Sequence, residues 1–178
     1  SVDAQGYFSL TASLTNGVNP AHGYVLSEFP GGIRNVFELD QPAPGYGAGV
    51  NIHQLGFGSN NISRAADGGT AFTGFVVGPG ITQSNNTGIW SEIDGMLRLA
   101  AGEGMAAPGT GGATFISDFG ASQFAYSINP HGQVAFIADT NDSNFGLWAQ
   151  DDLGNLHKIL RGGDLFEVAP GDFRTVSD

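Results

Sequence analysis

The stretch NPHGQVAF, residues 129–136, decides how this chain is expected to fold. Within NPHG, Asn suits the first position of a type I turn, Pro the second because its φ is already set, and Gly the fourth. Two related stretches, AADGGTAF and DAQGYFSL, occur at residues 65–72 and 3–10. Their glycines are Gly6, Gly68 and Gly132, which lie 62 and 64 residues apart. The motif therefore predicts a tight turn leading into a half-buried strand, written three times along the chain.

Two other landmarks recur at nearly the same spacing. A glycine followed by apolar residues appears in GYVL, GIWS and GLWA, at residues 23–26, 88–91 and 146–149. A Pro-Gly pair begins at Pro44, Pro108 and Pro170, at intervals of 64 and 62 residues. Three landmarks that agree predict tandem units of about 63 residues, a period that indicates a propeller-like or solenoid architecture. In this alignment Val25 takes the position of Trp90 and Trp148, for which we expect a shared role in the core.

Each unit is expected to hold four antiparallel strands. In the third unit, apolar periodicity and turn residues place them at 122–128, 133–139, 146–151 and 156–161, followed by a loop that carries Ala-Pro-Gly. Asp94-Gly95 is a pair typical of two-residue hairpin turns. Taken alone, SEIDGMLRLAA also fits an amphipathic helix, but its central glycine and the turn residues of the sister units favour strands.

We therefore predict an all-β fold of tandem four-stranded antiparallel repeats, with three β-propeller-like blades in a single repeat domain over residues 1–178. The expected repeat boundaries are about 1–58, 59–121 and 122–178. Propeller rings typically contain at least four blades. Three blades therefore predict an incomplete ring or an open array, which belongs to a longer chain of repeats or depends on a neighbouring molecule.

Composition excludes several classes of partner. The 178 residues contain 17 acidic and only six basic side chains, for a net charge of −11, which argues against a nucleic-acid partner. No apolar run approaches the ~20 residues needed to span a bilayer, so no membrane insertion is expected. There is no Cys, and neither a disulfide framework nor a thiolate metal site is available. With 29 glycines and 13% charged residues, the chain is typical of turn-rich β structure.

The pattern N-x-x-G-x-x-A-F, followed by Gly-Ile-Trp or Gly-Leu-Trp and then by an Ala-Pro-Gly loop leading to GGATFISDFG, resembles the bacterial tandem-repeat family named for its NxxGxxAF motif. The resemblance covers nearly the whole chain. It is close in the third unit, good in the second, where Ala65 replaces Asn, and poor in the first, where Asp3, Ser9 and Leu10 depart from the motif. The resemblance implies an exported protein of the extracellular space or cell-envelope surface with blade-like β repeats, and it brings no catalytic residues.

One stretch, DTNDSN at residues 139–144, is a candidate metal site. Asp139, Asn141 and Asp142 supply hard oxygen ligands at close spacing in a loop between strands, which is the chemistry that calcium prefers. The corresponding loop of the second unit, QSNNTG, has no carboxylate, and Asx-rich sequence is also what a tight turn uses. Calcium is therefore the single cofactor candidate, with a solvated turn as the alternative.

Catalytic motifs are absent from the sequence. It contains no GxSxG, HxH or HExxH, and no Lys follows its Gly-rich stretches GPG and GTGG. We therefore expect a non-enzymatic surface scaffold or a module that binds glycans or proteins. The alternative is a propeller-type hydrolase or lyase acting on extracellular polysaccharide. A catalytic propeller should show a central pocket lined by clustered carboxylates, His or Arg, whereas a scaffold should show scattered polar groups.

The first unit starts at its turn and so lacks an opening strand, which leaves YFSLTA (7–12) without the partner strand of its sisters. Such an edge pairs readily with other extended segments. We predict self-association by β-strand addition, with the tail, residues 172–178, pairing within the chain or, as we favour, with a neighbouring copy head to tail. The assembly edge predicted in this way consists of Tyr7, Phe8, Leu10, Phe173, Thr175 and Val176.

Overall fold

The computed structural model describes the chain apart from residues 1, 15–21, 58–60, 67–68, 122–124 and 178. Every regular element in the described residues is a β-strand, which confirms the predicted all-β fold. No helix that could cross a membrane occurs in this part of the chain. Gly68, the beginning of the predicted strand 122–128 and the predicted repeat boundaries near 58 and 122 lie outside the described residues.

The strands form antiparallel sheets of two to five strands, none of which closes on itself in the described part of the chain. The N-terminal sheet contains β1 (Ser9–Leu14), β2 (His22–Phe29) and β3 (Gly32–Glu38). The central sheet contains β4 (Asn51–Leu55), β5 (Ile62–Arg64), β6 (Thr70–Val77), β7 (Thr87–Ile93) and β8 (Met96–Gly102). The C-terminal sheet contains β9 (Tyr126–Ile128), β10 (Val134–Thr140), β11 (Asn144–Gln150) and β12 (Leu156–Arg161). The terminal hairpin consists of β13 (Leu165–Ala169) and β14 (Asp172–Thr175).

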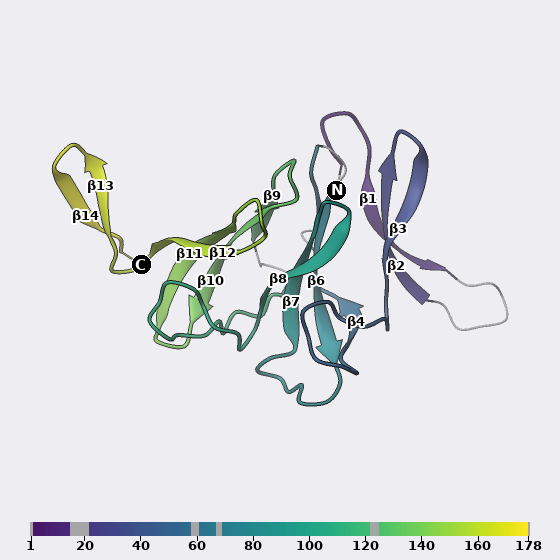
Figure 1. Cartoon of the computed structure of the whole chain (residues 1–178), viewed down its shortest axis with the longest axis horizontal. Coiled ribbons are helices and arrows are strands. Elements are labelled where there is room, and N and C mark those ends of the chain that lie inside the picture. Colours follow the sequence, from purple (N-terminus) through teal and green to yellow (C-terminus); the bar gives the residue numbers. More distant parts are fainter. Residues whose placement is uncertain (1, 15–21, 58–60, 67–68, 122–124, 178) are drawn as a thin grey trace.

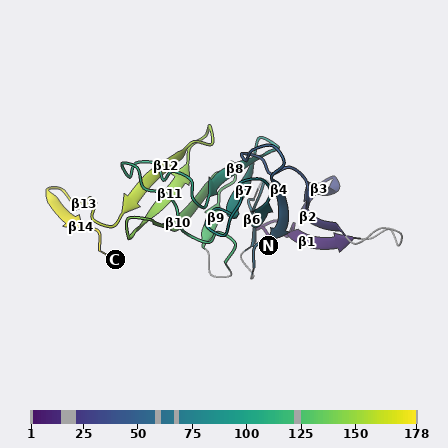
Figure 2. The ribbon, with the colours of Figure 1, turned by 90° about the horizontal axis from the view of Figure 1, so that it is seen from below.

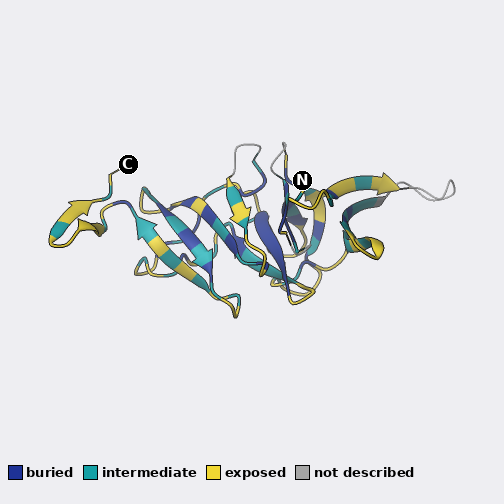
Figure 3. Ribbon diagram, turned by 90° about the horizontal axis from the view of Figure 1, so that it is seen from above, coloured by how far each residue is buried: buried dark blue, intermediate teal, exposed yellow. Residues whose placement is uncertain are grey.

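The three larger sheets lie in a row, with the terminal hairpin projecting beyond the C-terminal sheet (Figures 1 and 2). The central sheet is covered on both faces, because the adjacent residues Ala71 and Phe72 on β6 are both fully buried although their side chains point to opposite faces. Every residue of β7 is buried as well. Burial therefore decreases from the central sheet toward both ends of the row (Figure 3).

One hydrophobic cluster joins the N-terminal and central sheets. Val25 of β2 packs there with Phe72 of β6 and Trp90 of β7, whose rings stack with centroids 5.8 Å apart. Hydrogen bonds accompany the apolar contacts, since the Ser9 hydroxyl lies 3.2 Å from that of Thr70. The covered face of the N-terminal sheet is thus the one that carries Ser9 and Val25.

A second cluster joins the central and C-terminal sheets in the same way. Ala71 and Ile89 of the central sheet pack against Phe136 of β10 and Trp148 of β11. The rings of Phe136 and Trp148 stack with centroids 6.3 Å apart, as those of Phe72 and Trp90 do. Each interface therefore joins small or aliphatic residues of one sheet to a Phe–Trp pair of the next.

The Ala-Pro-Gly loops fasten each of these interfaces. The indole nitrogen of Trp90 donates a hydrogen bond to the carbonyl oxygen of Pro44 at 3.0 Å, and that of Trp148 donates to Pro108 at 3.1 Å. The glycine after each proline has a positive φ and lies against the last strand of the next sheet. A Cβ at Gly45 would come within 2.6 Å of Leu99, and one at Gly109 within 3.0 Å of Lys158.

The turns of the three related stretches 3–10, 65–72 and 129–136 make an equivalent backbone hydrogen bond. The backbone N–H groups at the first turn position donate to the carbonyl oxygen four residues later, at 2.9 Å (Asp3 to Tyr7), 2.8 Å (Ala65 to Gly69) and 3.0 Å (Asn129 to Gln133). The described turn glycines, Gly6 and Gly132, have φ values of +89° and +80°. The sequence similarity of these stretches thus corresponds to a shared local geometry.

Two details differ from the sequence-based expectations. The residue that faces the equivalent of Phe72 in the first sheet is Leu26, which pairs with Leu10 as Trp90 pairs with Phe72, so the alignment of Val25 with the tryptophans was wrong by one residue. The cause is that Gly23 was matched with Gly88, whereas Tyr24 takes the position of Gly88, since Tyr24 pairs with Ala12 as Gly88 pairs with Gly74. The loop expected after β12 is instead the β13–β14 hairpin, with Pro170-Gly171 at its turn.

Candidate functional site

A cleft of about 680 Å³ opens where the turns of three sheets meet. The N-terminal sheet contributes the residues beside its β2–β3 turn, the central sheet the β7–β8 turn, and the C-terminal sheet the turns before β10 and after β11. Antiparallel sheets stacked in register bring the same strand ends together, which is why these turns converge. The lining residues are Phe29, Arg34, Gly69, Glu92, Ile93, Asp94, Gly95, His131 and Asp152.

An ion pair between two sheets forms one wall of the cleft. The guanidinium of Arg34 on β3 donates from Nη2 to Glu92 Oε2 at 2.5 Å, and Nη1 contacts Oε1. The Glu92 side chain is only 4% exposed, whereas that of Arg34 is 36% exposed. Hydrogen bonding to Glu92 raises the pKa of the Arg34 guanidinium. Both oxygens of the most buried carboxylate in the cleft are thus held by a bidentate partner.

The NPHG turn forms another part of the lining, beside Glu92. Asn129 Oδ1 accepts the backbone N–H groups of His131 at 3.0 Å and Gln133 at 3.1 Å, which fixes the turn and leaves the His131 side chain exposed at the cleft. A Cβ added at Gly132 would lie 2.0 Å from the carbonyl oxygen of Glu92. The glycine is therefore required both by its positive φ and by direct contact with the end of β7.

Two exposed carboxylates complete the lining. Asp94 lies in the β7–β8 turn with φ +53° beside Gly95 with φ +73°, as the predicted Asp-Gly hairpin turn requires. Asp152 accepts a hydrogen bond from the side-chain amide of Gln133 at 2.9 Å. This bond ties the β11–β12 turn to the NPHG turn, so the carboxylate has a defined position at the edge of the cleft.

The residue before Asp152 stabilises the same turn. Asp151 accepts hydrogen bonds from the backbone N–H groups of Leu153 and Asn155 at 2.9 and 2.8 Å. Its Oδ2 lies 2.9 Å from His157 Nε2, and hydrogen bonding from the side chains of His157 and Asn155 holds the pKa of Asp151 well below its ordinary value. The β11–β12 turn that presents Asp152 is therefore built around an ionised carboxylate.

The cleft combines positively and negatively charged hydrogen-bonding groups with the phenyl ring of the exposed Phe29. Such a lining can bind polar ligands by charge-assisted hydrogen bonds and by contact with an aromatic face. Among the described residues, no group of three or more His, Cys, Asp or Glu side chains is placed to hold a metal ion. The functional groups available at the cleft are thus carboxylates, an arginine guanidinium and a histidine imidazole.

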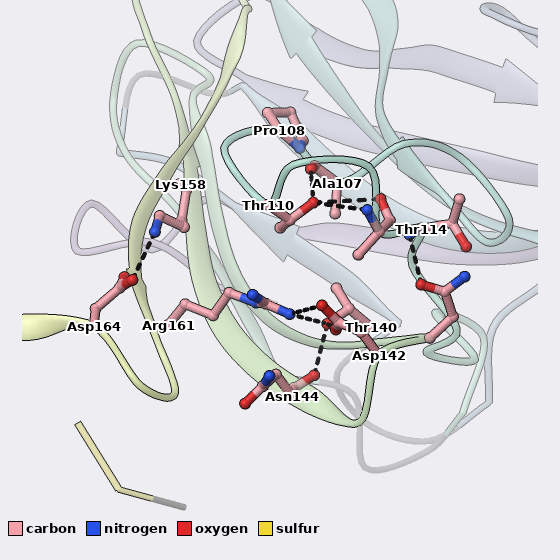
Figure 4. Close-up of polar contacts among 12 residues, drawn as sticks. Ala107, Pro108, Thr110, Thr114, Thr140, Asp142, Asn144, Lys158, Arg161 and Asp164 are labelled. Carbon is pink, nitrogen blue, oxygen red and sulfur yellow. Dashed lines mark hydrogen bonds and ion pairs between the residues drawn. The ribbon is translucent and has the colours of Figure 1, made fainter. Parts of the chain in front are cut away.

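The candidate calcium loop lies away from this cleft, and its three residues have partners within the protein. Asp142 accepts from the Thr140 hydroxyl at 2.7 Å and forms an ion pair with Arg161 (Figure 4). The Asn141 side chain accepts the backbone N–H of Thr114 at 3.1 Å, while the N–H of Asp139 donates to the Ser117 hydroxyl at 2.7 Å. Hydrogen bonding to Arg161 holds the pKa of Asp142 below its ordinary value. Calcium binding at this loop stays a prediction.

The residues of the predicted assembly edge do not come together. Tyr7, Phe8 and Leu10 belong to the N-terminal sheet or the turn before it, and Phe173, Thr175 and Val176 belong to the terminal hairpin or follow it, at the opposite end of the row (Figure 1). The tail does not pair with the first sheet, because β14 pairs with β13. At the N-terminal edge, Val2 forms an isolated bridge with Phe8. Pairing of the tail with this edge inside one chain is therefore wrong for this structure.

Sequence reasoning does not find the cleft. His131, Asp94-Gly95 and Asp151-Asp152 read only as turn or solvated surface residues, and Arg34 and Glu92 carry no motif. A usable signal is nevertheless present, since the lining residues of each sheet come from turns at corresponding positions of the units. Charged or aromatic residues clustered at equivalent turns of stacked repeats mark one shared end of the stack.

No curated protein and no solved structure matches this chain. One family model, described as a family of unknown function, DUF7453, matches residues 1–178. The match spans the whole sequence, and the chain accordingly belongs to the DUF7453 family.

Proposed function

We propose that this protein is a non-enzymatic scaffold and binding module of the extracellular space or cell surface, built from three propeller-like blades that form an incomplete ring or an open array. The blade interpretation is supported by the four-stranded meander β9–β12, by its counterpart β5–β8, and by the contacts of β5 with both β1 and β9. β5 and β9, the short first strands of their sheets, contact one another, as expected of blades arranged around an axis. The extracellular location is supported by the resemblance to NxxGxxAF repeats.

The observation that carries the binding function is the cleft shared by three sheets. Because Arg34, Glu92 and His131 come from three different sheets, the stacking of the sheets positions the groups that would contact a ligand. Sites held by rigid strands and fixed turns bind without reorganisation. We propose a glycan or a polar segment of another protein as the ligand, since both present the hydroxyl and amide groups that these side chains bind.

The alternative, a hydrolase or lyase acting on extracellular polysaccharide, is favoured by one observation. Glu92, Asp94, Asp152 and His131 cluster in the cleft, as expected of a catalytic pocket rather than of scattered surface polarity. Glycoside hydrolysis needs one carboxyl group free to donate a proton and a second to act as nucleophile or base. Glu92 is held by Arg34 through both oxygens, which leaves Asp94 and Asp152 as the carboxylates for that chemistry.

A glycan array with detection of newly formed reducing ends separates the two functions. We expect bound glycan without new reducing ends, and we expect the double variant Asp94→Asn/Asp152→Asn to lose at least tenfold in affinity. Asp172→Asn is the matched control, because Asp172 is an exposed carboxylate on the terminal hairpin, ion-paired with Arg174. New reducing ends that disappear in the double variant would establish the enzyme instead. Binding that is equal in all three proteins would remove the cleft from the proposal.

A further inference from the structure

The same type of interface occurs twice inside this chain, and in the described part of the chain each of its two faces is also left open once. We propose that the open face of the C-terminal sheet binds the open face of the N-terminal sheet of a second copy, so that copies associate head to tail by stacking sheets face to face. This deepens the self-association predicted from the sequence, and it rests on the propeller-like stacking of the proposed function. It differs from strand addition, because the contact uses side chains on sheet faces rather than backbone edges.

The open face of the C-terminal sheet is identified by the strand register. Cross-strand partners share a face, so Ala135 lies with Ala149, and Ile137 lies with Leu147, which pairs in turn with Leu160. On β10 these residues alternate with the buried Val134, Phe136 and Ala138 of the covered face. Ile137 is 53% exposed. The face is thus an aliphatic surface at the end of the row.

This face corresponds to the covered faces of the other two sheets. In the central sheet the equivalent positions are Ala71, Thr73 and Ile89, because Thr73 pairs with Ile89 as Ile137 pairs with Leu147. In the N-terminal sheet they include Ser9 and Val25, which are almost completely buried. In both sheets the face is buried under the Phe–Trp face of the sheet that follows.

The open face of the N-terminal sheet corresponds to those Phe–Trp faces. Leu10 pairs with Leu26 in the place where Phe72 pairs with Trp90, and Ala12 pairs with Tyr24 beside them. Leu10 is 37% exposed, while its neighbour on the other face, Ser9, is buried. A leucine pair with an adjacent tyrosine thus presents an apolar surface where the other sheets present stacked rings.

Polar groups at the margin of the two faces are complementary in the same sense as those within the chain. Arg34 on β3, which pairs with Ser27, reaches Glu92 of the next sheet. His157 on β12 occupies the position of Arg34, because it pairs with Ala149 as Arg34 pairs with Ser27. Glu28, one residue beyond Ser27 on β2, occupies the position of Glu92. Stacking of a second copy therefore brings its Glu28 toward His157.

The terminal hairpin supplies the third element of the contact. Pro44-Gly45 and Pro108-Gly109 each lie against the sheet that follows them. Within the described residues, no atom lies within 4 Å of the Cβ position of Gly171, which follows Pro170 at the tip of the hairpin. The hairpin therefore projects beyond the C-terminal sheet, on the side where the next sheet would lie (Figure 1).

Sedimentation velocity on the whole chain and on two variants tests the proposal. Ile137→Asp blocks the open face of the C-terminal sheet, and Leu10→Asp blocks that of the N-terminal sheet. We expect the unmodified chain to associate in the micromolar range and each variant alone to be monomeric. An equimolar mixture of the two variants should form a heterodimer, because each variant retains the one face that the other needs.

Val77→Asp is the matched control, because Val77 is 47% exposed at the end of β6, on neither open face; it should associate like the unmodified chain. If an Asp variant loses its β-sheet circular dichroism, Ile137→Asn and Leu10→Asn replace it in the same mixture experiment. An unmodified chain that stays monomeric, or a mixture that forms no heterodimer, would overturn the head-to-tail contact. Glycan binding by the monomeric variants tests the cleft independently, so the two proposals can fail separately.

Discussion

At the scale of single residues, the NPHG turn owes its glycine to a neighbour that is distant in sequence. Gly6 and Gly132 occupy equivalent turn positions with nearly the same positive φ, which costs any other L-residue about 1–2 kcal/mol. Only Gly132 also touches another sheet, through the Glu92 carbonyl. Comparing substitutions at Gly6 and Gly132 therefore separates the free energy of backbone strain in the turn from that of packing between sheets.

We expect Gly132→Ala to lower the free energy of unfolding by about 3–5 kcal/mol, because strain from the positive φ adds to overpacking against Glu92. Gly6→Ala should lower it by only about 1–2 kcal/mol, since no atom lies within 4 Å of its Cβ position in the described residues. Urea denaturation of both variants measures the difference. Equal losses in the two variants would mean that the NPHG turn does not press on β7.

Asp142 provides a test of the ion pair that occupies the candidate calcium loop. Its folded-state pKa is lowered by hydrogen bonding to Arg161, so the pair stabilises the fold above the ordinary carboxyl pKa, and this stabilisation is lost as the pH falls through the folded-state pKa. We expect Asp142→Asn to reduce stability at pH 7 and to have a smaller effect near pH 3. Urea midpoints at the two pH values measure this, and a constant difference would contradict the assigned pair.

Calcium binding by the same loop can be tested through the melting temperature of the protein. If Asp139, Asn141 and Asp142 bind calcium, the ion must displace Arg161 from Asp142, and millimolar calcium should raise the melting temperature by linkage. Asp139→Asn should abolish that rise. An unchanged melting temperature in calcium would show that Arg161 remains the cation of this loop.

At this scale the sequence predicts what is local and misses what is remote. The hydrogen bonds of Asn129 and the positive φ of Gly132 follow from the letters NPHG, because a turn is decided by four adjacent residues. The contact of Gly132 with Glu92 depends on how two sheets stack, and a sequence without an alignment carries no record of that. The cleft, which is made from such contacts, was therefore not predicted.

At the scale of elements, the Ala-Pro-Gly loops connect consecutive sheets through a hydrogen bond and a close contact. Each loop offers a proline carbonyl to a tryptophan indole and a glycine to the last strand of the same sheet. The loop thus satisfies the one polar atom of an otherwise apolar ring. This explains why each of these tryptophans in the sequence is preceded by a Pro-Gly pair.

We expect Trp148→Phe to lower the free energy of unfolding by about 2–3 kcal/mol, from the lost hydrogen bond to Pro108 and the smaller ring. It should also make the loop at 107–113 sensitive to protease. Phe136→Leu is the control, because it removes ring volume from the same cluster and leaves the hydrogen bond in place. Equal protease sensitivity in both variants would show that packing alone holds the loop.

Strand positions were predicted where turn residues bracket an apolar run. The prediction of 156–161 coincides with β12, and those of 133–139 and 146–151 differ from β10 and β11 by one or two residues at their ends. The stretch that leads to Pro170-Gly171 was predicted as a loop and the tail after it as a strand that pairs elsewhere, whereas β13 and β14 pair with each other in a hairpin. The two sister stretches with Ala-Pro-Gly do form loops, each joined by a single bridge. The strands of the hairpin are exposed along their length, so no apolar periodicity marked them.

At the scale of the whole molecule, stability is concentrated in the middle of the row. The central sheet contributes one face to each hydrophobic cluster, whereas the N-terminal and C-terminal sheets contribute one face each to a single cluster. The terminal hairpin has no buried residue on either of its strands. Local opening should therefore require least free energy at the two ends.

Amide hydrogen exchange measures this gradient. We expect the slowest exchange in β6 and β7, intermediate exchange in β2 and β10, and exchange in β13 and β14 close to that of an unstructured chain. At protein concentrations where copies associate, protection should rise on β1 and β10. A terminal hairpin as protected as β7 at low concentration would contradict a stability that is concentrated in the central sheet.

An all-β fold of several antiparallel sheets could be predicted from the sequence, but the order of contacts between the sheets could not. Leu10 and Ile137 were both visible as apolar residues in predicted strands, and only the burial of their neighbours Ser9 and Phe136 shows which face of each strand stays open. The sequence shows that successive side chains of a strand point to alternate faces, but it does not show which face packs against another sheet.

Ala71 and Phe72 are each buried on their own side of β6, and this limits where the chain can tolerate inserted or deleted residues. Insertion of one residue in β6 would turn every later side chain of that strand to the opposite face. Aromatic rings would then lie where the packing requires small residues, and small residues would lie where it requires rings. Both clusters would be damaged by a single event. We therefore expect insertions and deletions to be tolerated in the connections, where the intervals of 62 and 64 residues between the turn glycines already differ.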